Sequence, residues 1–345
     1  MVRHRGLTPL ARCEKVASMA DELDRIHGCL AGLAVGDAMG RPTELLFNYR
    51  RIEKKYGHVE TLVGRAAGAV TDDTRLTLTV ADAILDVGHL VSADELVDHW
   101  KRDPEFSWRK FLRSYNRNEG FWFGEHVVAF AGRLGVPGHL TGYLNASALF
   151  AGNEAAMIMA PVGIVCRGKP AAAAEAGREM SRACMVGAGA DMAGAWAAAI
   201  SSSLSSGATV ESVLESATEN ATARIQPFIA TALRAADGFD DVLEAREALY
   251  ARCLRPIQVD SRETVPVALA LFKIAGGDPM TAVIGGANFG RDSDTIAGMA
   301  GLLSGAMSGV GAIDAGIYRR VLEVNGFDLE SYASRLAAVT PYVAR

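Results

Sequence analysis

Two short acidic clusters hold the residues best suited to chemistry. The clusters read Thr71-Asp72-Asp73-Thr74 and Gly290-Arg291-Asp292-Ser293-Asp294-Thr295. Each one comes directly before an apolar segment, so each is predicted to open a helix. One Asp or Ser at such a place is ordinary, because it caps free N–H groups and complements the helix dipole. Two carboxylates in one cluster exceed what capping requires, although a doubled cap is the plain alternative for Asp72-Asp73 taken alone.

The types of these side chains favour a hard cation. Carboxylate and hydroxyl oxygens without His or Cys select Mg²⁺, with Mn²⁺ also possible. The seven histidines show no ligand spacing, and no H-E-x-x-H motif occurs. If the two clusters meet in space, four Asp carboxylates share a small volume and need compensation. Two divalent ions would supply that compensation.

A helix predicted over residues 21–40 must position the first group of residues. Glycines recur in it at every fourth position, 28, 32, 36 and 40. Each costs roughly 1 kcal/mol of helix propensity relative to Ala, so the stripe indicates a bare face against which another backbone packs. Asp37 lies on or near the buried stripe. Glu44 follows the break at Gly40-Arg41-Pro42, either as an acid held at a cleft mouth or as a solvated loop acid.

The remaining elements are also predicted to be helical. A helix is expected from the first acidic cluster to about Val87, others are expected to begin at Pro266 and at Pro279, and the last helices follow the second cluster to about residue 335. No alternation of period two is long enough to support a sheet. The prediction is an all-α fold, a compact orthogonal helical bundle, with residues 1–20 as a flexible leader and 21–345 as a single domain.

An aromatic-rich segment over residues 100–123 has two interpretations. Core packing is the common one, and a wall on which a flat ring stacks is the functional one. Glycines at 120 and 124 favour a loop around Phe121 and Trp122, and binding aromatics often lie on loops.

Composition excludes several classes of function. The chain has 345 residues, half of them apolar and 22% charged, which is typical of a globular protein. A net charge of −5 gives no footprint for nucleic acid, and no basic run indicates a membrane surface. The five scattered cysteines favour a reducing, cytoplasmic setting, and the most apolar run, 296–313, is shorter than the roughly 20 residues that span a bilayer. The sequence does not indicate an oligomeric state.

Familiar catalytic motifs are absent from the sequence. The segment from Gly285 to Asp292 lacks the Lys-Ser/Thr of a phosphate-binding loop, and no G-x-S-x-G occurs. The pair Asp72-Asp73 lacks the third acid of an Asp-rich prenyl-diphosphate motif, because Leu76 stands there.

Three motifs together resemble the ADP-ribosylglycohydrolases. They are Gly32-Leu-Ala-Val-Gly36-Asp37-Ala-Met-Gly40-Arg-Pro42-Thr-Glu44, Thr71-Asp72-Asp73-Thr74 and Asn288-Phe-Gly290-Arg291-Asp292-Ser293-Asp294-Thr295. The resemblance spans roughly residues 25–310 and implies an all-α fold with two Mg²⁺ (or Mn²⁺) ions at the helix ends. It implies metal ligands at Thr71, Asp72, Asp73, Asp292, Asp294 and Thr295, with Glu44 as the acid near the ribose and the ions.

The resemblance also implies the reaction, hydrolysis of the bond between C1″ of ADP-ribose and an acceptor side chain or small leaving group. A metal-bound water would attack the anomeric carbon, and carboxylates would stabilise its oxocarbenium-like charge. The candidates for catalysis are Glu44, Asp73 and Asp292. The candidates for substrate contact are Glu44, Asp37, Phe121, Trp122, Asn153, Arg291 and Ser293. The expected partner is a small ribosyl molecule or an ADP-ribosylated protein.

Several positions depart from the family's usual pattern. The family usually has glycine at position 291, and its central motif usually has Gly after the Asn and Arg before Ala-Pro, where this chain has Glu154 and Met159. Met185-Val186 stand in place of an expected Thr-His pair. These departures predict a divergent member that acts on another ribosyl or nucleoside-like molecule. The alternatives are a metal-dependent enzyme for a prenyl diphosphate and a non-catalytic binding protein on the same fold.

Overall fold

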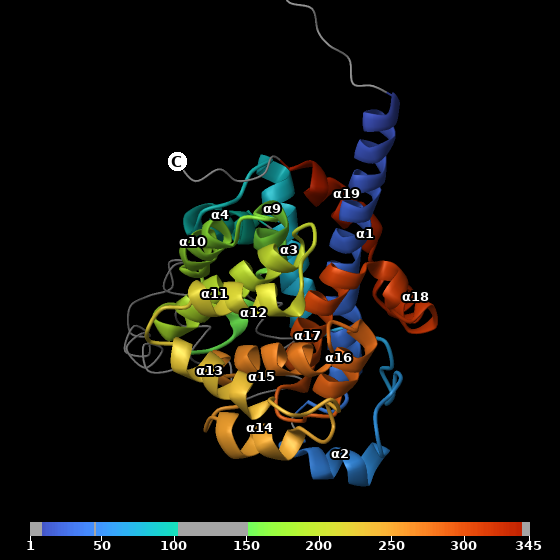
Figure 1. The fold of residues 1–345 in the computed structure, drawn as a ribbon, viewed down its shortest axis with the longest axis vertical. Coiled ribbons are helices and arrows are strands. Elements are labelled where there is room, and N and C mark those ends of the chain that lie inside the picture. Colours follow the sequence, from blue (N-terminus) through green and yellow to red (C-terminus); the bar gives the residue numbers. More distant parts are fainter. Residues whose placement is uncertain (1–8, 45, 103–150, 340–345) are drawn as a thin grey trace, which may run out of the picture.

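The computed structural model describes residues 9–44, 46–102 and 151–339 (Figure 1). Within these ranges every regular element is a helix, and the one β-bridge, between Gly152 and Asp260, is isolated. The prediction of an all-α fold is therefore confirmed. In chain order the α-helices are α1 (Pro9–Gly40), α2 (Tyr49–Tyr56), α3 (Asp72–Val87), α4 (Ala93–Arg102), α8 (Glu154–Met157), α9 (Ala160–Val165), α10 (Pro170–Ser181), α11 (Ala188–Ser203), α12 (Val210–Glu219), α13 (Gln226–Ala235), α14 (Arg246–Cys253), α15 (Ser261–Ile274), α16 (Pro279–Ala287), α17 (Ser293–Ser308), α18 (Ala315–Asn325) and α19 (Leu329–Ala338).

The glycine stripe of α1 packs directly against the backbone of α17. A Cβ added at Gly32 would lie 2.1 Å from the Gly301 carbonyl oxygen, and one at Gly40 would lie 2.3 Å from the Ser293 carbonyl oxygen. The two helices therefore run antiparallel with their backbones close together along the stripe. Figure 1 shows α17 beside α1. The predicted bare face is confirmed. This contact brings the C-terminus of α1, with Glu44 just beyond it, to the N-terminus of α17.

The interior of the fold is built around α11, α15 and α17. Small side chains let these helices approach closely, and the largest fully buried side chains are Trp196 on α11, Phe272 on α15 and Phe289 just before α17. Burying a large aromatic side chain stabilises a fold by about 1.5–3 kcal/mol relative to its exposed state. The helices that carry the site described below are therefore packed on a large apolar core.

Two predicted helix starts are wrong. Helix α1 begins at Pro9 and not near residue 21, so residues 9–20, expected in a loose leader, are helical. Helix α15 begins at Ser261 and not at Pro266, because the Asp260 side chain accepts a hydrogen bond from the Arg262 N–H and caps the helix five residues earlier. Pro266 lies in the second turn, where its missing N–H removes one intrahelical hydrogen bond. The start of α16 at Pro279 is confirmed.

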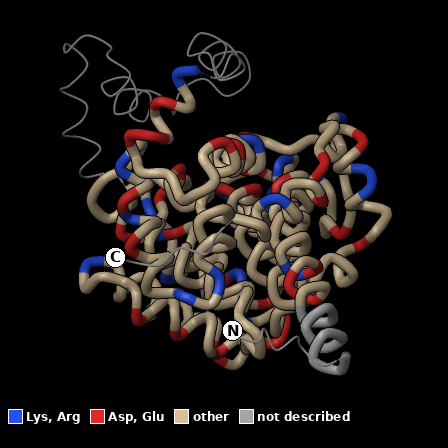
Figure 2. Tube along the Cα trace, turned by 90° about the horizontal axis from the view of Figure 1, so that it is seen from above, with Lys and Arg blue, Asp and Glu red and all other residues tan. Residues whose placement is uncertain are grey.

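Charged positions of both signs alternate over the outside of the fold, as Figure 2 shows along the trace. In the described ranges, we find no helix that combines the length and the apolar character needed to cross a bilayer. Phe121 and Trp122 lie outside the described residues, as does the rest of the segment 103–150.

Candidate functional site

The N-terminus of α3 is capped by a threonine, which leaves its aspartates for another task. The Thr71 hydroxyl accepts a hydrogen bond from the Asp73 N–H at 3.4 Å and donates to the Asp73 carboxylate at 3.2 Å. Asp73 is buried, and Asp72, the first residue of the helix, is half-buried. A doubled aspartate cap is therefore not what the structure shows here.

The N-terminus of α17 begins differently. Asp292 occupies the cap position, yet its side chain makes no capping hydrogen bond. It accepts instead from the side-chain amide of Asn153, which reaches it from the start of α8. Asp294 and Thr295, in the first turn, are both buried. A cap residue whose carboxylate does not cap the N–H groups of its helix can serve another purpose.

The two acidic helix ends meet. The Thr295 hydroxyl on α17 donates to the Asp73 carboxylate at the start of α3, with 3.2 Å between the oxygens. Burial is the main cause that raises the pKa values of Asp73 and Asp294. The charge of Asp292 raises that of Asp73 further, and the charge of Asp73 raises that of Asp294 further, as expected of neighbouring carboxylates. Segments more than 200 residues apart in sequence thus share one site.

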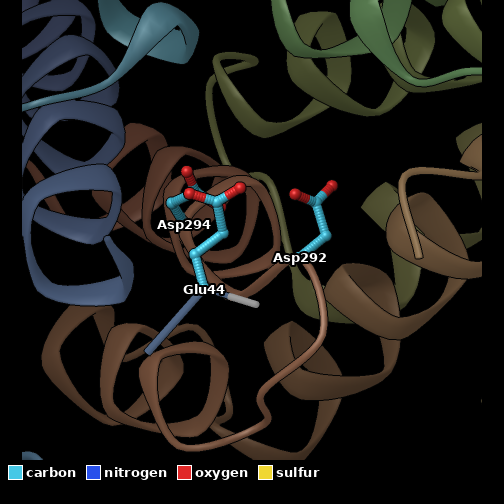
Figure 3. Close-up of side chains that lie close together, drawn as sticks. All are labelled: Glu44, Asp292 and Asp294. Atoms are coloured by element: carbon cyan, nitrogen blue, oxygen red, sulfur yellow. The ribbon is translucent and has the colours of Figure 1, made fainter. Parts of the chain in front are cut away.

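Glu44 joins this site from the end of α1. Its carboxylate and those of Asp292 and Asp294 each offer an oxygen, and these oxygens lie within 4.8 Å of one another. Figure 3 shows the carboxylates of Glu44 and Asp294 close together, with that of Asp292 beside them. Glu44 is half-buried and the two aspartates are buried, so Glu44 forms the more open side of the cluster. Of its two interpretations, the acid at a cleft mouth fits this geometry.

The electrostatics of the site fit a bound cation. Burial, followed by neighbouring carboxylates, holds the pKa values of Asp73 and Asp294 well above their ordinary range. Burial raises the pKa of Asp292 to about 7, although hydrogen bonds from Asn153 and Thr295 work in the opposite direction. One oxygen of Asp73 and one of Asp294 are buried without a hydrogen-bond partner. Buried oxygens without donors, on crowded carboxylates, are the donor set that Mg²⁺ or Mn²⁺ takes.

Asp37, expected near the substrate, is buried and hydrogen-bonded to the first turn of α3. It is fully buried, and its oxygens accept hydrogen bonds from the N–H groups of Thr71 and Thr74 and from the Thr74 hydroxyl, at 2.6 to 3.1 Å. The aspartate of α1 therefore holds the first turn of α3 in place. No periodic pattern in the sequence links Asp37 to Thr71 and Thr74, so this partnership was not predicted.

Ser293 also has a supporting position. It is fully buried, and its hydroxyl lies 2.9 Å from that of Thr43 and donates to the Gly40 carbonyl oxygen. Thr43 in turn donates to the Ala287 carbonyl oxygen at 2.7 Å. These hydroxyls fasten the end of α1 to the start of α17. The expected contact of Ser293 with substrate does not fit this burial.

Arg291 is engaged by an acid that the sequence did not single out. Its guanidinium forms two hydrogen bonds of 2.7 Å with the carboxylate of Glu263, which is fully buried on α15. Its backbone φ is +66°, a left-handed conformation that glycine adopts far more readily. Because Glu263 occupies the guanidinium, the structure gives Arg291 a role in holding its loop.

Comparison with known proteins identifies the class. The profile of the ADP-ribosylglycohydrolase family matches residues 18–343, and the chain belongs to that family. The family supports a glycosyl hydrolase activity. A solved structure described as an ADP-ribosylglycohydrolase-related protein complex shares the fold, with a TM-score of 0.64 and 22% identity over 93% of this chain and 99% of its own.

Some sequence relatives match most of this chain, and others match only part of it. The uncharacterized protein YegU of Escherichia coli (strain K12) is 29% identical over 91% of this chain and 96% of its own length. The ADP-ribosylarginine hydrolases Tri1 match shorter parts. That of Serratia proteamaculans is 29% identical over 34% of this chain and 35% of its own. That of Pseudomonas putida is 40% identical over 25% and 23%.

Proposed function

We propose that this protein is a Mg²⁺-dependent hydrolase of a ribosyl glycosidic bond. Two divalent cations, with Mn²⁺ as the alternative ion, would be held by Thr71, Asp72, Asp73, Asp292, Asp294 and Thr295. The observation that carries the proposal is the pair of buried carboxylates, Asp73 and Asp294, at two helix ends that a hydrogen bond joins. Each has a buried oxygen without a hydrogen-bond donor. Family membership supports the hydrolase class.

When bound, such ions would neutralise the carboxylates, orient the hydroxyls of a sugar and lower the pKa of a water molecule. The protein's own groups would do the rest. The buried aspartates would stabilise positive charge as it develops at the anomeric carbon. Glu44 is the proposed acid or base, because its carboxylate adjoins Asp292 and Asp294 yet remains half open to solvent. Asp73 and Asp292 are the other candidates for this role.

The proposed substrate is an ADP-ribosylated side chain or a small ADP-ribosyl or nucleoside-like molecule. The Tri1 relatives, named for ADP-ribosylarginine, support an N-linked leaving group as the first to test. Because the Arg291 guanidinium is bound by Glu263, we do not count it among the phosphate contacts. Phe121 and Trp122 remain proposed contacts for a flat ring.

The test is hydrolysis of a panel of substrates with and without Mg²⁺. The panel contains ADP-ribosyl-arginine, ADP-ribosyl-serine, an ADP-ribosylated protein and a simple nucleoside, with release of ADP-ribose or ribose as the signal. We expect at least one N- or O-riboside to be cleaved, with activity lost in EDTA and restored by excess Mg²⁺. Full activity after exhaustive EDTA treatment would contradict the proposal.

The two alternative functions give other outcomes. Consumption of a prenyl diphosphate without cleavage of any riboside would favour the diphosphate enzyme. Binding of Mg²⁺ and of ADP-ribose without turnover of any substrate would favour the non-catalytic binding protein. Of the three, the hydrolase is the one that the family match supports.

A further inference from the structure

Two loops bring Glu44 and Asp292 into the site, and both have strained backbones. The first follows α1, where residues 41–44 and 46–48 are described, and the second joins α16 to α17. Among the described residues, the non-glycine positions with positive φ are Phe47, at +58°, and Arg291, at +66°. Phe47 is at the centre of a three-residue turn closed by a 2.7 Å hydrogen bond from the Asn48 N–H to the Leu46 carbonyl oxygen. Such conformations persist only where the surrounding structure enforces them.

The phenol of Tyr250, on α14, joins the two loops. Its hydroxyl accepts a hydrogen bond from the Tyr49 N–H at 3.2 Å and donates one to the Phe289 carbonyl oxygen. Its ring also packs on both sides, with centroid distances of 5.1 Å to Tyr49 and 4.8 Å to Phe289. Burial raises the pKa of the Tyr250 phenol, so the group stays a proton donor at neutral pH. One hydroxyl therefore pairs with the backbone of each loop.

Arg246 makes a second bridge one helical turn earlier on α14, on the same face as Tyr250. Its guanidinium forms an ion pair of 2.7 Å with Glu53 on α2 and lies 4.6 Å from the Tyr49 ring centroid. It also donates to the Asn288 carbonyl oxygen at 3.3 Å. Its side chain is only 7% exposed, so these contacts are largely shielded from water. Figure 1 shows α14 beside α2 at the lower end of the fold.

The two loops also touch each other at Gly290. A Cβ added there would lie 3.2 Å from the Asn48 carbonyl carbon and 3.3 Å from the Tyr250 hydroxyl oxygen. The two backbones therefore approach so closely that a side chain at position 290 would press against the first loop. The two loops and α14 therefore form one set of contacts.

We propose that Tyr250 and Arg246 are positioning residues, and that α14 clamps the Glu44 loop to the Asp292 loop at the spacing a cation needs. This inference rests on the proposed function only in taking Asp292 and Asp294 as metal ligands, with Glu44 beside them. The carboxylates of Glu44, Asp292 and Asp294 repel one another, and their oxygens would separate if the loops could part. A clamp that holds them together before the ion binds lowers the free-energy cost of ordering the ligands on binding. Neither residue touches the reacting atoms in this account.

The test is Tyr250→Phe, which removes the bridging hydroxyl and keeps the ring. The matched control is Tyr318→Phe, which removes a phenol hydroxyl that lies 2.7 Å from the His27 ring nitrogen. Mg²⁺ affinity is measured by titration calorimetry, and amide hydrogen exchange is measured over residues 46–49 and 288–292. We expect Tyr250→Phe to weaken Mg²⁺ binding by about tenfold or more and to speed exchange in both loops. We expect Tyr318→Phe to change neither quantity.

A second variant, Arg246→Lys, keeps the charge that faces Glu53 and loses the planar stacking on Tyr49. We expect it to change the same two quantities in the same direction by smaller factors. Wild-type Mg²⁺ affinity in Tyr250→Phe would overturn the proposal. So would equal losses of affinity in Tyr250→Phe and Tyr318→Phe, because that result would show a general structural effect.

The exchange measurement separates this proposal from the proposed function. If the wild-type protein binds no Mg²⁺, the proposed metal centre fails and the clamp is judged by exchange alone. Faster exchange of both loops in Tyr250→Phe would then support the clamp. Faster exchange of the Tyr49 loop with no change over residues 288–292 would overturn it.

Discussion

The two acidic helix ends look alike in sequence and are built in different ways. At α3, Thr71 caps the helix, and Asp37 from α1 accepts further hydrogen bonds from its first turn. At α17, Asp292 stands at the cap position without capping, and Asn153 orients its carboxylate. The helix cap is therefore a side chain at the first end only, while each end keeps one buried carboxylate oxygen without a hydrogen-bond partner, on Asp73 and on Asp294. The comparison teaches that the number of acids at a helix end matters less than which of them are already used.

The largest expected effect comes from Asp294→Asn. We expect Mg²⁺ affinity to fall by more than about 100-fold, because loss of a ligand should exceed the roughly 10–100-fold cost of losing a supporting partner. The metal-free variant should melt at a higher temperature than the wild type, since burial raises the pKa of Asp294 and its charge opposes folding at neutral pH. Calorimetric titration and thermal melts in EDTA check the two effects.

The control for Asp294→Asn is Asp278→Asn at the start of α16. Asp278 caps that helix by accepting from the Thr281 N–H at 2.8 Å, and the bond is exposed. We expect it to lower stability by about 1 kcal/mol or less and to leave Mg²⁺ binding unchanged. A metal-free Asp294→Asn protein that melts below the wild type would contradict the electrostatic account.

The support beneath both ends is tested by Gly32→Ala. The added methyl group would lie 2.1 Å from the Gly301 carbonyl oxygen, so α1 and α17 must move apart. We expect a loss of about 3 kcal/mol in the free energy of unfolding, measured by denaturant titration. Gly311→Ala is the control, because a Cβ there meets no atom within 4 Å. Equal stabilities of the two variants would show that the close packing of α1 on α17 is not needed.

Asp292, at the α17 end, should make the stability of the metal-free protein depend on pH. Its pKa is about 7 in the folded protein against an ordinary value of 3.8, so between those values the folded state binds more protons than the unfolded state. Stability of the metal-free protein should therefore fall as pH rises toward 7, by at most about 1.4 kcal/mol per pH unit from this group. Above about pH 7 this contribution is lost and the dependence levels off.

The measurement is the free energy of unfolding of the wild type and of Asp292→Asn from pH 5 to pH 8 in EDTA. We expect the variant to gain on the wild type up to about pH 7 and then keep a constant lead. A difference that does not vary with pH would show that Asp292 titrates alike in both states.

The smallest expected effect is at the α3 end. Thr71→Ala removes the cap and the hydroxyl that donates to Asp73, and we expect it to lower the free energy of unfolding by about 1 kcal/mol. Thr71→Ser keeps the hydroxyl and should retain most of the stability. Thermal melts of the two variants decide the point, and equal losses in both would assign the effect to the lost methyl group.

Much of the fold followed from local patterns in the sequence. The glycine stripe of α1 predicted a backbone contact because only a missing side chain permits one, and the acidic clusters predicted helix starts because capping is a local interaction. The predicted starts of α1 and α15 were wrong because Pro and Asp occur both at helix starts and in loops. The sequence around Pro9 and Asp260 therefore did not show that helices begin there.

The candidate site was predicted less completely than the fold. The types of Asp73, Asp292 and Asp294 pointed to it, and their convergence fits the expectation. The partners of Asp37, Ser293 and Arg291 were missed because they come from distant segments that share no periodic signal with them. Glu263 and Tyr250 belong to helices that look ordinary in sequence, and only the folded chain places them against the site loops.

The central claim is that the ends of α3 and α17 jointly hold divalent cations. The most direct measurement is anomalous diffraction from crystals grown with Mn²⁺, which locates each ion independently of the protein atoms. The account predicts peaks among the carboxylates of Asp73, Asp292 and Asp294. The account would be contradicted if crystals of the folded protein saturated with Mn²⁺ showed no peak at this place. Peaks found only at the molecular surface would also contradict it.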